Sequence, residues 1–227
     1  MVFKAIFWKE AKSLRKNLKA KVVMSIGTMF LIYFLLFIRL QTTSLSFKTY
    51  QNSVNYMTFI FGYIMFISNL RFWYEKNMKM LEILFILPAK LYTIIFAKIA
   101  LPILISVLSS VFFYLLSLCF GFIAFEASIF SVKQLGQILL LNTFFQVCYS
   151  IINCYAMWCA SLTYAKVIQF ISIVLYMGSA FTLFALPTGF SLYDSLGTWI
   201  VMMILGIYAM ICYFRIDKEK AINTLSV

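Results

Sequence analysis

Residues 99–125 read IALPILISVLSSVFFYLLSLCFGFIAF and contain no charged side chain. A helix needs roughly 20 apolar residues to cross the hydrocarbon core of a bilayer, and this stretch exceeds that length. Only helices and closed barrels satisfy every backbone polar group inside a bilayer. The stretch therefore predicts an all-α integral membrane protein.

Five more apolar stretches accompany this one along the chain. They cover residues 22–38, 54–70, 135–159, 167–186 and 198–214, and together with 99–125 they predict a bundle of six transmembrane helices between residues 22 and 214. The connections expected on one side, around 39–53, 126–134 and 187–197, are too short to form a separate domain.

The composition agrees with an integral membrane protein and argues against several other classes of protein. The chain of 227 residues is 64% hydrophobic and 11% charged, with a formal net charge of +12. Nucleic-acid binding would explain the charge, but most basic residues flank the apolar stretches, as in membrane proteins. The chain contains no histidine, and its five cysteines form no CxxC pair. We therefore expect no catalytic residues, no metal site and no disulfide framework.

The distribution of lysine and arginine predicts the orientation in the membrane. In the six-span arrangement one side carries sixteen of the nineteen basic residues and the other only Arg39, Lys48 and Lys133. Cytoplasmic segments hold the excess of such residues. The N-terminal segment and the tail 215–227 are therefore both expected in the cytosol.

The first 21 residues predict an amphipathic helix on the cytosolic membrane surface. Apolar residues recur at helical spacing and lysine or arginine occupies most other positions. A cleavable signal peptide is the alternative, but the basic region is long and no small-residue cleavage pattern follows it.

Between the second and third stretches, residues 71–90 read RFWYEKNMKMLEILFILPAK. Met78, Leu81 and Phe85 fall on one face of a helix, while Lys79 and Glu82 lie on the other. Pro88 lacks a backbone donor and disfavours helix at the residue before it, so this short helix is expected to end there. An ordinary solvated loop with a surface helix is the alternative reading.

This segment resembles the corresponding region of the type-two permease family of ATP-binding-cassette (ABC) transporters. The matching positions are Glu75, Leu81-Glu82, Leu84-Phe85, Pro88 and Lys98. The chain departs from the family pattern at Lys79-Met80, where the family usually has Gly-Thr, and at Phe85, which replaces the second leucine. Six spans, an amphipathic N-terminal helix and a basic cytosolic face extend the resemblance over nearly the whole chain.

The resemblance implies that residues 74–87 form a coupling helix that docks on a separate ATPase subunit. The residues implied in this contact are Glu75, Met78, Leu81, Glu82, Phe85 and Pro88. The chain has no GxxxxGK[ST] loop, so ATP and Mg²⁺ would be bound by the partner ATPase rather than by this chain. The resemblance also implies pairing with a second permease chain, a homodimer being favoured and a heterodimer possible.

Polar residues within the apolar stretches are candidates for contact with the transported substance, because such residues are costly in a bilayer. The resemblance points to the second and fifth spans, whose polar faces carry Asn55, Thr58, Tyr63, Gln169, Ser172 and Tyr176. Hydrogen bonds between helices would give the same pattern. For the polar stripe of the fourth span, Asn142, Gln146, Ser150 and Asn153, interhelical hydrogen bonding is the favoured interpretation.

A cavity lined by these faces would be uncharged, aromatic and methionine-rich. Such a cavity suits an amphipathic cargo better than an ion or a sugar. Small type-two permeases without an external domain resemble bacterial exporters of amphipathic peptides such as bacteriocins or cytolytic modulins, which makes a peptide the expected cargo. The abundance of lysine, isoleucine and phenylalanine favours a bacterial plasma membrane. The alternatives are a non-transporting scaffold or peptide-immunity protein and, with little chemistry to support it, a membrane enzyme.

Overall fold

The computed structural model describes residues 2–16, 18–42, 47–70, 72, 89–125, 132–160, 163–171, 173–174, 196–217, 219 and 221. Over these residues the chain is helical and contains no strand. The helices are α1 (Val2–Lys16), α2 (Leu18–Thr42), α3 (Phe47–Asn69), α6 (Leu91–Phe125), α7 (Val132–Cys159) and α9 (Leu196–Arg215). Residues 163–171 form a further helical stretch between α7 and α9. The all-α prediction is confirmed for this part of the chain.

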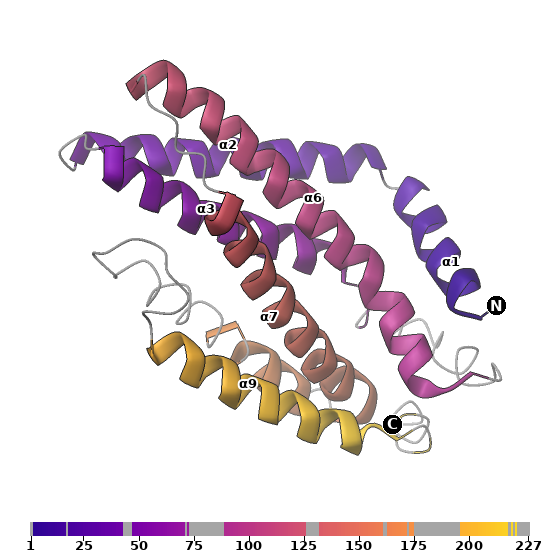
Figure 1. Cartoon of the computed structure of the whole chain (residues 1–227). Helices are drawn as coiled ribbons and strands as arrows, with labels where there is room; N and C mark the ends of the chain where they lie inside the picture. The colour runs from indigo at the N-terminus through magenta and orange to yellow at the C-terminus, as the bar shows by residue number, and fades with distance from the viewer. Residues whose placement is uncertain are drawn as a thin grey trace.

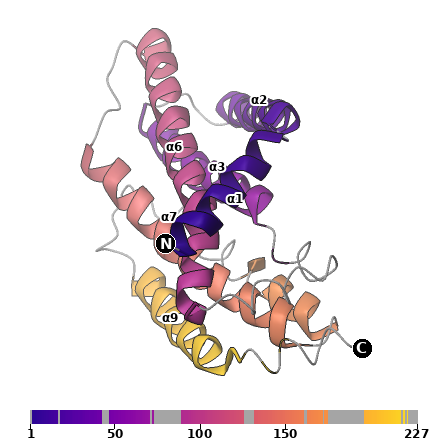
Figure 2. The same cartoon turned by 90° about the vertical axis from the view of Figure 1, so that its right-hand side faces the viewer.

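The long helices run back and forth along the molecule (Figure 1). α2 leads away from the end at which α1 lies and α3 returns to it; α6 leads away again, and both α7 and α9 run back toward that end. α3 packs against α6, α7 and α2, while α1 lies on α6 and α9 lies on α7. Figure 2 shows the same bundle from the side at which α1 lies.

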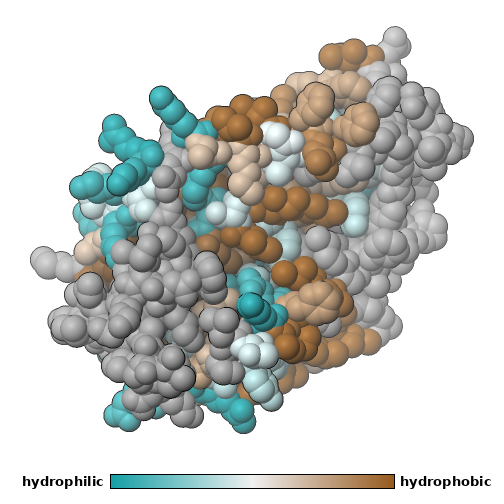
Figure 3. All heavy atoms as spheres, turned by 180° about the vertical axis from the view of Figure 1, so that it is seen from behind, coloured by the Kyte–Doolittle hydropathy of each residue, from teal (hydrophilic) through white to brown (hydrophobic). Residues whose placement is uncertain are grey.

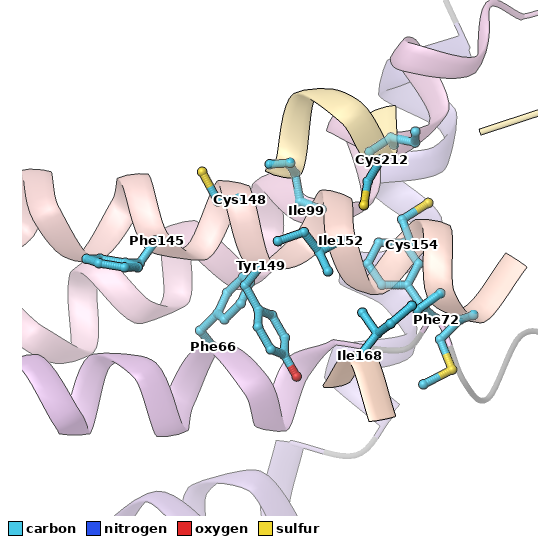
Figure 4. Packing of buried hydrophobic residues seen from close by; sticks show 14 of the residues in the cluster. Phe66, Phe72, Ile99, Phe145, Cys148, Tyr149, Ile152, Cys154, Ile168 and Cys212 are labelled. Carbon is cyan, nitrogen blue, oxygen red and sulfur yellow. The ribbon is translucent and has the colours of Figure 1, made fainter. Parts of the chain in front are cut away.

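Buried apolar side chains fill two connected regions of the bundle. The larger region joins α3, α6, α7 and α9 and includes Ile6 of α1; the smaller joins α2, α3 and α6 around Tyr50 and Phe113. In the larger region the ring of Phe66 meets that of Tyr149 edge to face, with centroids 6.2 Å apart (Figure 4). Such aromatic pairs add packing specificity to the burial of their surface.

The outer surface of the helices is also apolar. On α6 the exposed side chains include Leu104, Leu108, Phe112 and Ile123, and α2 and α9 likewise present exposed Val, Ile, Met and Phe residues. On the face seen from behind, Figure 3 shows apolar residues over much of the described surface, with the hydrophilic residues gathered mainly toward one side. A soluble monomer rarely exposes so much contiguous apolar surface.

Two helices in the described part of the chain are long and apolar enough to cross a membrane, judged by length and composition. They are Leu91–Ile123 and Val132–Cys159, and Trp199–Arg215 is a shorter apolar helix. They correspond to the third, fourth and sixth predicted spans. Of the predicted fifth span, 167–186, only residues 167–171 and 173–174 lie inside the described ranges.

Several helix boundaries differ from the predicted ones. The N-terminal helix was expected to cover residues 1–21, but α1 ends at Lys16 and residues from Leu18 onward belong to α2. α3 begins at Phe47 and α6 at Leu91, each several residues before its apolar stretch. Hydropathy marks the part of a helix that is apolar, whereas the hydrogen-bonded backbone continues through the polar residues at its ends.

Candidate functional site

Four contacts bring the ends of the helices together at one end of the molecule, which we call the basic end. Lys98 of α6 pairs with Glu10 of α1, Lys21 of α2 donates a hydrogen bond to Asn69 of α3, Phe72 contacts Trp158 of α7, and Cys159 of α7 contacts the carbonyl of Asp217. These contacts join α1, the start of α2, the end of α3, the start of α6, and the ends of α7 and α9.

Most described lysine and arginine residues belong to these helix ends. They are Lys4, Lys9, Lys12, Arg15, Lys16, Lys19, Lys21, Lys90, Lys98, Lys166 and Arg215. Lys133, at the start of α7, lies at the opposite end of that helix. The separation of charge inferred from the sequence is thus matched by the direction in which the helices run (Figure 1).

The ion pair between Glu10 and Lys98 attaches α1 to α6 at the basic end. Glu10 Oε1 lies 3.6 Å from Lys98 Nζ, and the two side chains are 13% and 5% exposed. Ile6, one turn before Glu10, is buried in the large apolar cluster. The face of α1 that carries Ile6 and Glu10 therefore packs on protein rather than on lipid. The prediction that the apolar residues of this helix lie on the membrane surface is therefore wrong for Ile6, whereas Phe3 is exposed.

Asn69 is the last residue of α3, and its side chain forms hydrogen bonds with three other residues. Its Nδ2 donates to the carbonyl of Met65 at 2.7 Å and to Ser68 Oγ at 3.3 Å, while its Oδ1 accepts from Lys21 Nζ. Lys21 is the fourth residue of α2, so a single amide connects the start of α2 to the end of α3.

Both described flanks of the predicted coupling segment lie at the basic end. Phe72 is buried against Trp158, with ring centroids 5.6 Å apart and planes at 83°. On the other flank, Lys90 lies over the ring of Tyr92 at the start of α6. Glu75, Met78, Leu81, Glu82, Phe85 and Pro88 themselves lie outside the described residues.

A second feature is a seam of buried polar residues where α3, α6 and α7 meet, which we call the polar seam. Ser106 Oγ of α6 donates to the carbonyl oxygen of Gly62 in α3 at 2.7 Å. Gln146 Nε2 of α7 donates to Ser106 Oγ at 2.6 Å and to Asn142 Oδ1 at 2.9 Å. These bonds connect three helices in the middle of the bundle.

Gly62 is the point of closest approach in the polar seam. A Cβ atom on this residue would collide with Ser110 Oγ and Asn142 Nδ2 and would lie 3.2 Å from Ser106 Oγ. Small residues allow helix backbones to approach closely in membranes, where packing replaces the hydrophobic effect as the main attraction between helices. The lack of a side chain at residue 62 thus permits the seam to form.

The structure confirms the interhelical hydrogen bond expected for Gln146, the second member of the stripe in the fourth span. Ser150 instead bonds within its own helix, its Oγ donating to the carbonyl of Gln146 at 2.7 Å. The interpretation of the sequence missed Ser106 and Ser110 of α6, the residues that the polar stripe of α7 faces. The available signal was a set of serines at spacings of four and seven in an otherwise apolar helix, Ser106, Ser110 and Ser117, all of which are buried.

The residues predicted to line a substrate pathway fall into two groups. Asn55, Thr58 and Tyr63 are buried within the bundle of this single chain, and Thr58 Oγ1 donates to the carbonyl of Val54 at 2.7 Å. Gln169 is partly buried, and its Nε2 lies 3.5 Å from Tyr149 Oη. Ser172 and Tyr176 lie outside the described residues. A role of these six residues in transport stays a prediction.

Some buried polar atoms have no hydrogen-bond partner among the described residues. Both amide atoms of Asn55, whose side chain is 1% exposed, are in this group, as are Ser110 Oγ and Asn153 Oδ1. Leaving such groups unpaired costs roughly 1–3 kcal/mol each, so they are uncommon in a packed bundle.

The described residues contain no cluster of three or more His, Cys, Asp or Glu side chains that could hold a metal ion. The five cysteines are free thiols, with Cys119 exposed near the far end of α6. Comparisons with protein-family models, with curated proteins and with solved structures find no match for this chain. A functional interpretation consequently depends on the residues themselves.

Proposed function

We propose that this chain is the transmembrane permease subunit of an ATP-driven ABC exporter of the type-two class. It would cross the bacterial plasma membrane six times, with both termini in the cytosol, and move an amphipathic or hydrophobic cargo such as a peptide, toxin or antimicrobial. The chain itself would not be an enzyme, because the ATP and Mg²⁺ would be bound by a separate ATPase subunit.

The observation that carries the proposal is the motif in residues 75–88 together with the position of its flanks. Glu75, Leu81-Glu82 and Pro88 match the coupling-helix pattern. The flanking residues Phe72 and Lys90 both lie next to helix ends at the basic end, the end expected in the cytosol. An ATPase subunit in the cytosol could reach a coupling helix there.

Six spans are supported by the alternating direction of the helices. α2, α3, α6 and α7 form two pairs that leave and return to the basic end, and α9 returns to it once more. The helical stretch 163–171 starts close after α7 and supplies the beginning of the fifth span. With α1 on the cytosolic surface, this order gives an even number of crossings.

A transporter needs at least two packings of the same helices, and α3 and the polar seam contain buried groups suited to a second one. The amide of Asn55 and the hydroxyl of Ser110 are buried without hydrogen-bond partners in the described arrangement. A movement of α3 relative to α6 and α7 that brings partners or water to these groups would be favoured by the hydrogen bonds gained. The seam is therefore our candidate for the part of the bundle that rearranges when the ATPase closes.

The decisive experiment is to co-express the chain with its ATPase, purify the complex in lipid, and measure cargo-stimulated ATP hydrolysis. Glu82→Ala should preserve the fold and the basal hydrolysis but remove most of the stimulation by cargo, because movement would no longer pass between the subunits. Glu126→Ala, a carboxylate expected at the opposite membrane surface, is the matched control and should keep the stimulation.

Unchanged stimulation in the Glu82→Ala complex would count against a coupling role for this segment. If the chain purifies without any nucleotide-binding subunit yet protects cells from an amphipathic peptide, the alternative of a non-transporting scaffold or immunity protein is the better one. A second copy of this chain in the complex would establish a homodimer, and a different permease chain a heterodimer.

A further inference from the structure

One face of α1 is occupied by the protein itself. Ile6 is 4% exposed in the large apolar cluster, and Glu10 pairs with Lys98 of α6. Glu10 is also the only acidic residue in α1. Since its charge is engaged with Lys98, the opposite face of the helix is left without a described carboxylate of α1 to balance its cations.

A basic hollow begins beside the buried face of α1 and extends around the helix toward the opposite face. Lys9, Lys12, Ser13 and Lys16 follow the spacing of one helix face, and with Arg15 they line a hollow of about 460 Å³. The four cationic side chains are exposed. The hollow is open to solvent, so it is a shallow surface site rather than an enclosed pocket, and its four cations favour an anion.

Trp8 stands beside the basic hollow. Its side chain is 71% exposed, and Lys4, Lys12 and Arg15 lie four residues before it and four and seven residues after it on the helix. Exposed indoles concentrate at membrane–water interfaces, where the ring sits at the level of the lipid headgroups. Next along the chain, α2 presents the exposed apolar side chains Val22, Val23 and Ile26.

We propose that the basic hollow, together with Trp8, binds the phosphate-bearing headgroup of an anionic phospholipid of the surrounding bilayer. The cations would contact the headgroup phosphate, the indole would lie among the headgroups, and the acyl chains would follow the exposed apolar surface of α2. An acidic protein surface would complement the charge equally well, but it would leave the exposed indole and the adjoining apolar side chains of α2 in water.

The ion pair gives this site a defined position. Because Glu10 and Ile6 hold α1 against α6, the basic hollow is presented at a constant distance from the transmembrane helices. The site requires only that α1 lie at a membrane surface, whatever the chain transports. Its failure in an experiment would therefore leave the proposed transport function untouched.

The test titrates the purified full-length chain with phosphatidylglycerol or phosphatidylcholine and follows bound lipid by native mass spectrometry. The native chain should bind phosphatidylglycerol preferentially. Lys9→Gln/Lys12→Gln/Lys16→Gln should weaken this binding about tenfold or more, since each cation near an anionic membrane surface contributes substantially to attraction. Trp8→Ala should weaken binding of both lipids.

The matched control, Lys90→Gln/Lys133→Gln/Lys166→Gln, removes the same charge from exposed lysines elsewhere and should change the affinity for phosphatidylglycerol less than about twofold. Equal losses in the two triple variants would overturn the proposal, because they would indicate general charge attraction. Equal affinity of the native chain for the two lipids would also overturn it.

Two further outcomes would show that the basic hollow binds something other than a lipid. Competition by inorganic phosphate that matches the affinity for phosphatidylglycerol would identify a site for free anions and contradict the lipid assignment. A hollow variant that keeps its lipid affinity but no longer purifies with an ATPase subunit would show that this face binds protein. Circular dichroism and gel filtration of every variant verify that the fold is retained.

Discussion

At the scale of single residues, Gly62 is the position at which the packing of three helices leaves least room. Gly62→Ala should destabilise the bundle by about 1–3 kcal/mol, because the added methyl group collides with Ser110 Oγ and Asn142 Nδ2 and forces α3 away from α6 and α7. The measurement is the midpoint of thermal unfolding of the purified chain in detergent, which should fall by several degrees.

Two other glycines provide the control for this substitution. A Cβ at Gly27 of α2 or Gly136 of α7 meets no atom within 4 Å, so alanine there should be neutral or slightly stabilising through its better helix propensity. Combining Gly62→Ala with Ser110→Ala should recover part of the lost stability, since it removes one of the colliding atoms. Equal midpoints for Gly62→Ala and Gly136→Ala would contradict the close contact.

The residues of the polar seam also show how far a polar pattern can be interpreted. The spacing of Asn142 and Gln146 predicted a hydrogen-bonding face on one helix, and the bond from Gln146 to Ser106 confirms it. The identity of the partner could not be predicted, because helical spacing specifies which residues share a face but not which helix that face meets. Ser106 and Ser110 were overlooked because single serines are common and inexpensive in membrane helices.

At the scale of elements, the attachment of α1 to α6 depends on the pair formed by Glu10 and Lys98. Glu10→Gln should loosen α1 from α6, because it removes the carboxylate that pairs with the nearly buried Lys98 side chain. Trypsin cleavage after the exposed Lys16, at the junction of α1 and α2, should then become faster. The rate is read from the loss of intact chain with time.

Lys98→Gln should have a smaller effect than Glu10→Gln, since Glu10 is more exposed and water can solvate its carboxylate. The double variant Glu10→Gln/Lys98→Gln should be cleaved more slowly than Glu10→Gln, because it removes the cation together with the carboxylate. Additive effects of the two substitutions would indicate that the side chains do not interact.

The two faces of α1 mark a limit of sequence interpretation. The apolar positions of α1 correctly predicted a helix with one apolar face. That face was predicted to contact lipid, whereas its residue Ile6 packs in the protein core. Both a bilayer and the side of α6 are apolar, and periodicity cannot distinguish them. The pairing of Glu10 with Lys98 was equally inaccessible, because the two residues are far apart in the chain.

At the scale of the whole molecule, the orientation of the bundle can be tested with two exposed lysines. In a cysteine-free background, Lys133→Cys should react with a membrane-impermeant maleimide added to intact cells, because it lies at the end of the bundle expected outside. Lys166→Cys should react only after permeabilisation, because it follows α7 at the basic end. Mass-tagged maleimide and gel shift measure the reaction.

Labelling of Lys166→Cys but not of Lys133→Cys in intact cells would place the basic end outside and remove the basis for a coupling helix. Labelling of both from outside would contradict a crossing by α7. Neither result would remove the lipid site on α1, since that site requires only that α1 lie at a membrane surface.

Much of the architecture could be predicted from the sequence because hydropathy is a local property. The apolar stretches 99–125 and 135–159 correspond to α6 and α7, the two helices able to span a bilayer by length and composition. Less of the candidate site could be predicted, since it depends on contacts between helices. The coupling residues, from Glu75 to Pro88, lie outside the described ranges and stay a prediction.

The hydroxyl of Ser117 in α6 donates to the carbonyl of Phe113 and shares a hydrogen bond with Tyr33 of α2, while its carbonyl accepts one from Tyr50 of α3. This joint, far from the basic end, contains no charge, whereas the joints made by Lys21 and Lys98 each include a cation. Dissolved electrolyte screens exposed charges, acts only weakly on a nearly buried pair such as Glu10 and Lys98, and leaves neutral hydrogen bonds almost unaffected. Concentrated salt should thus leave both extremities closed, and only the basic one should respond to the removal of a charge.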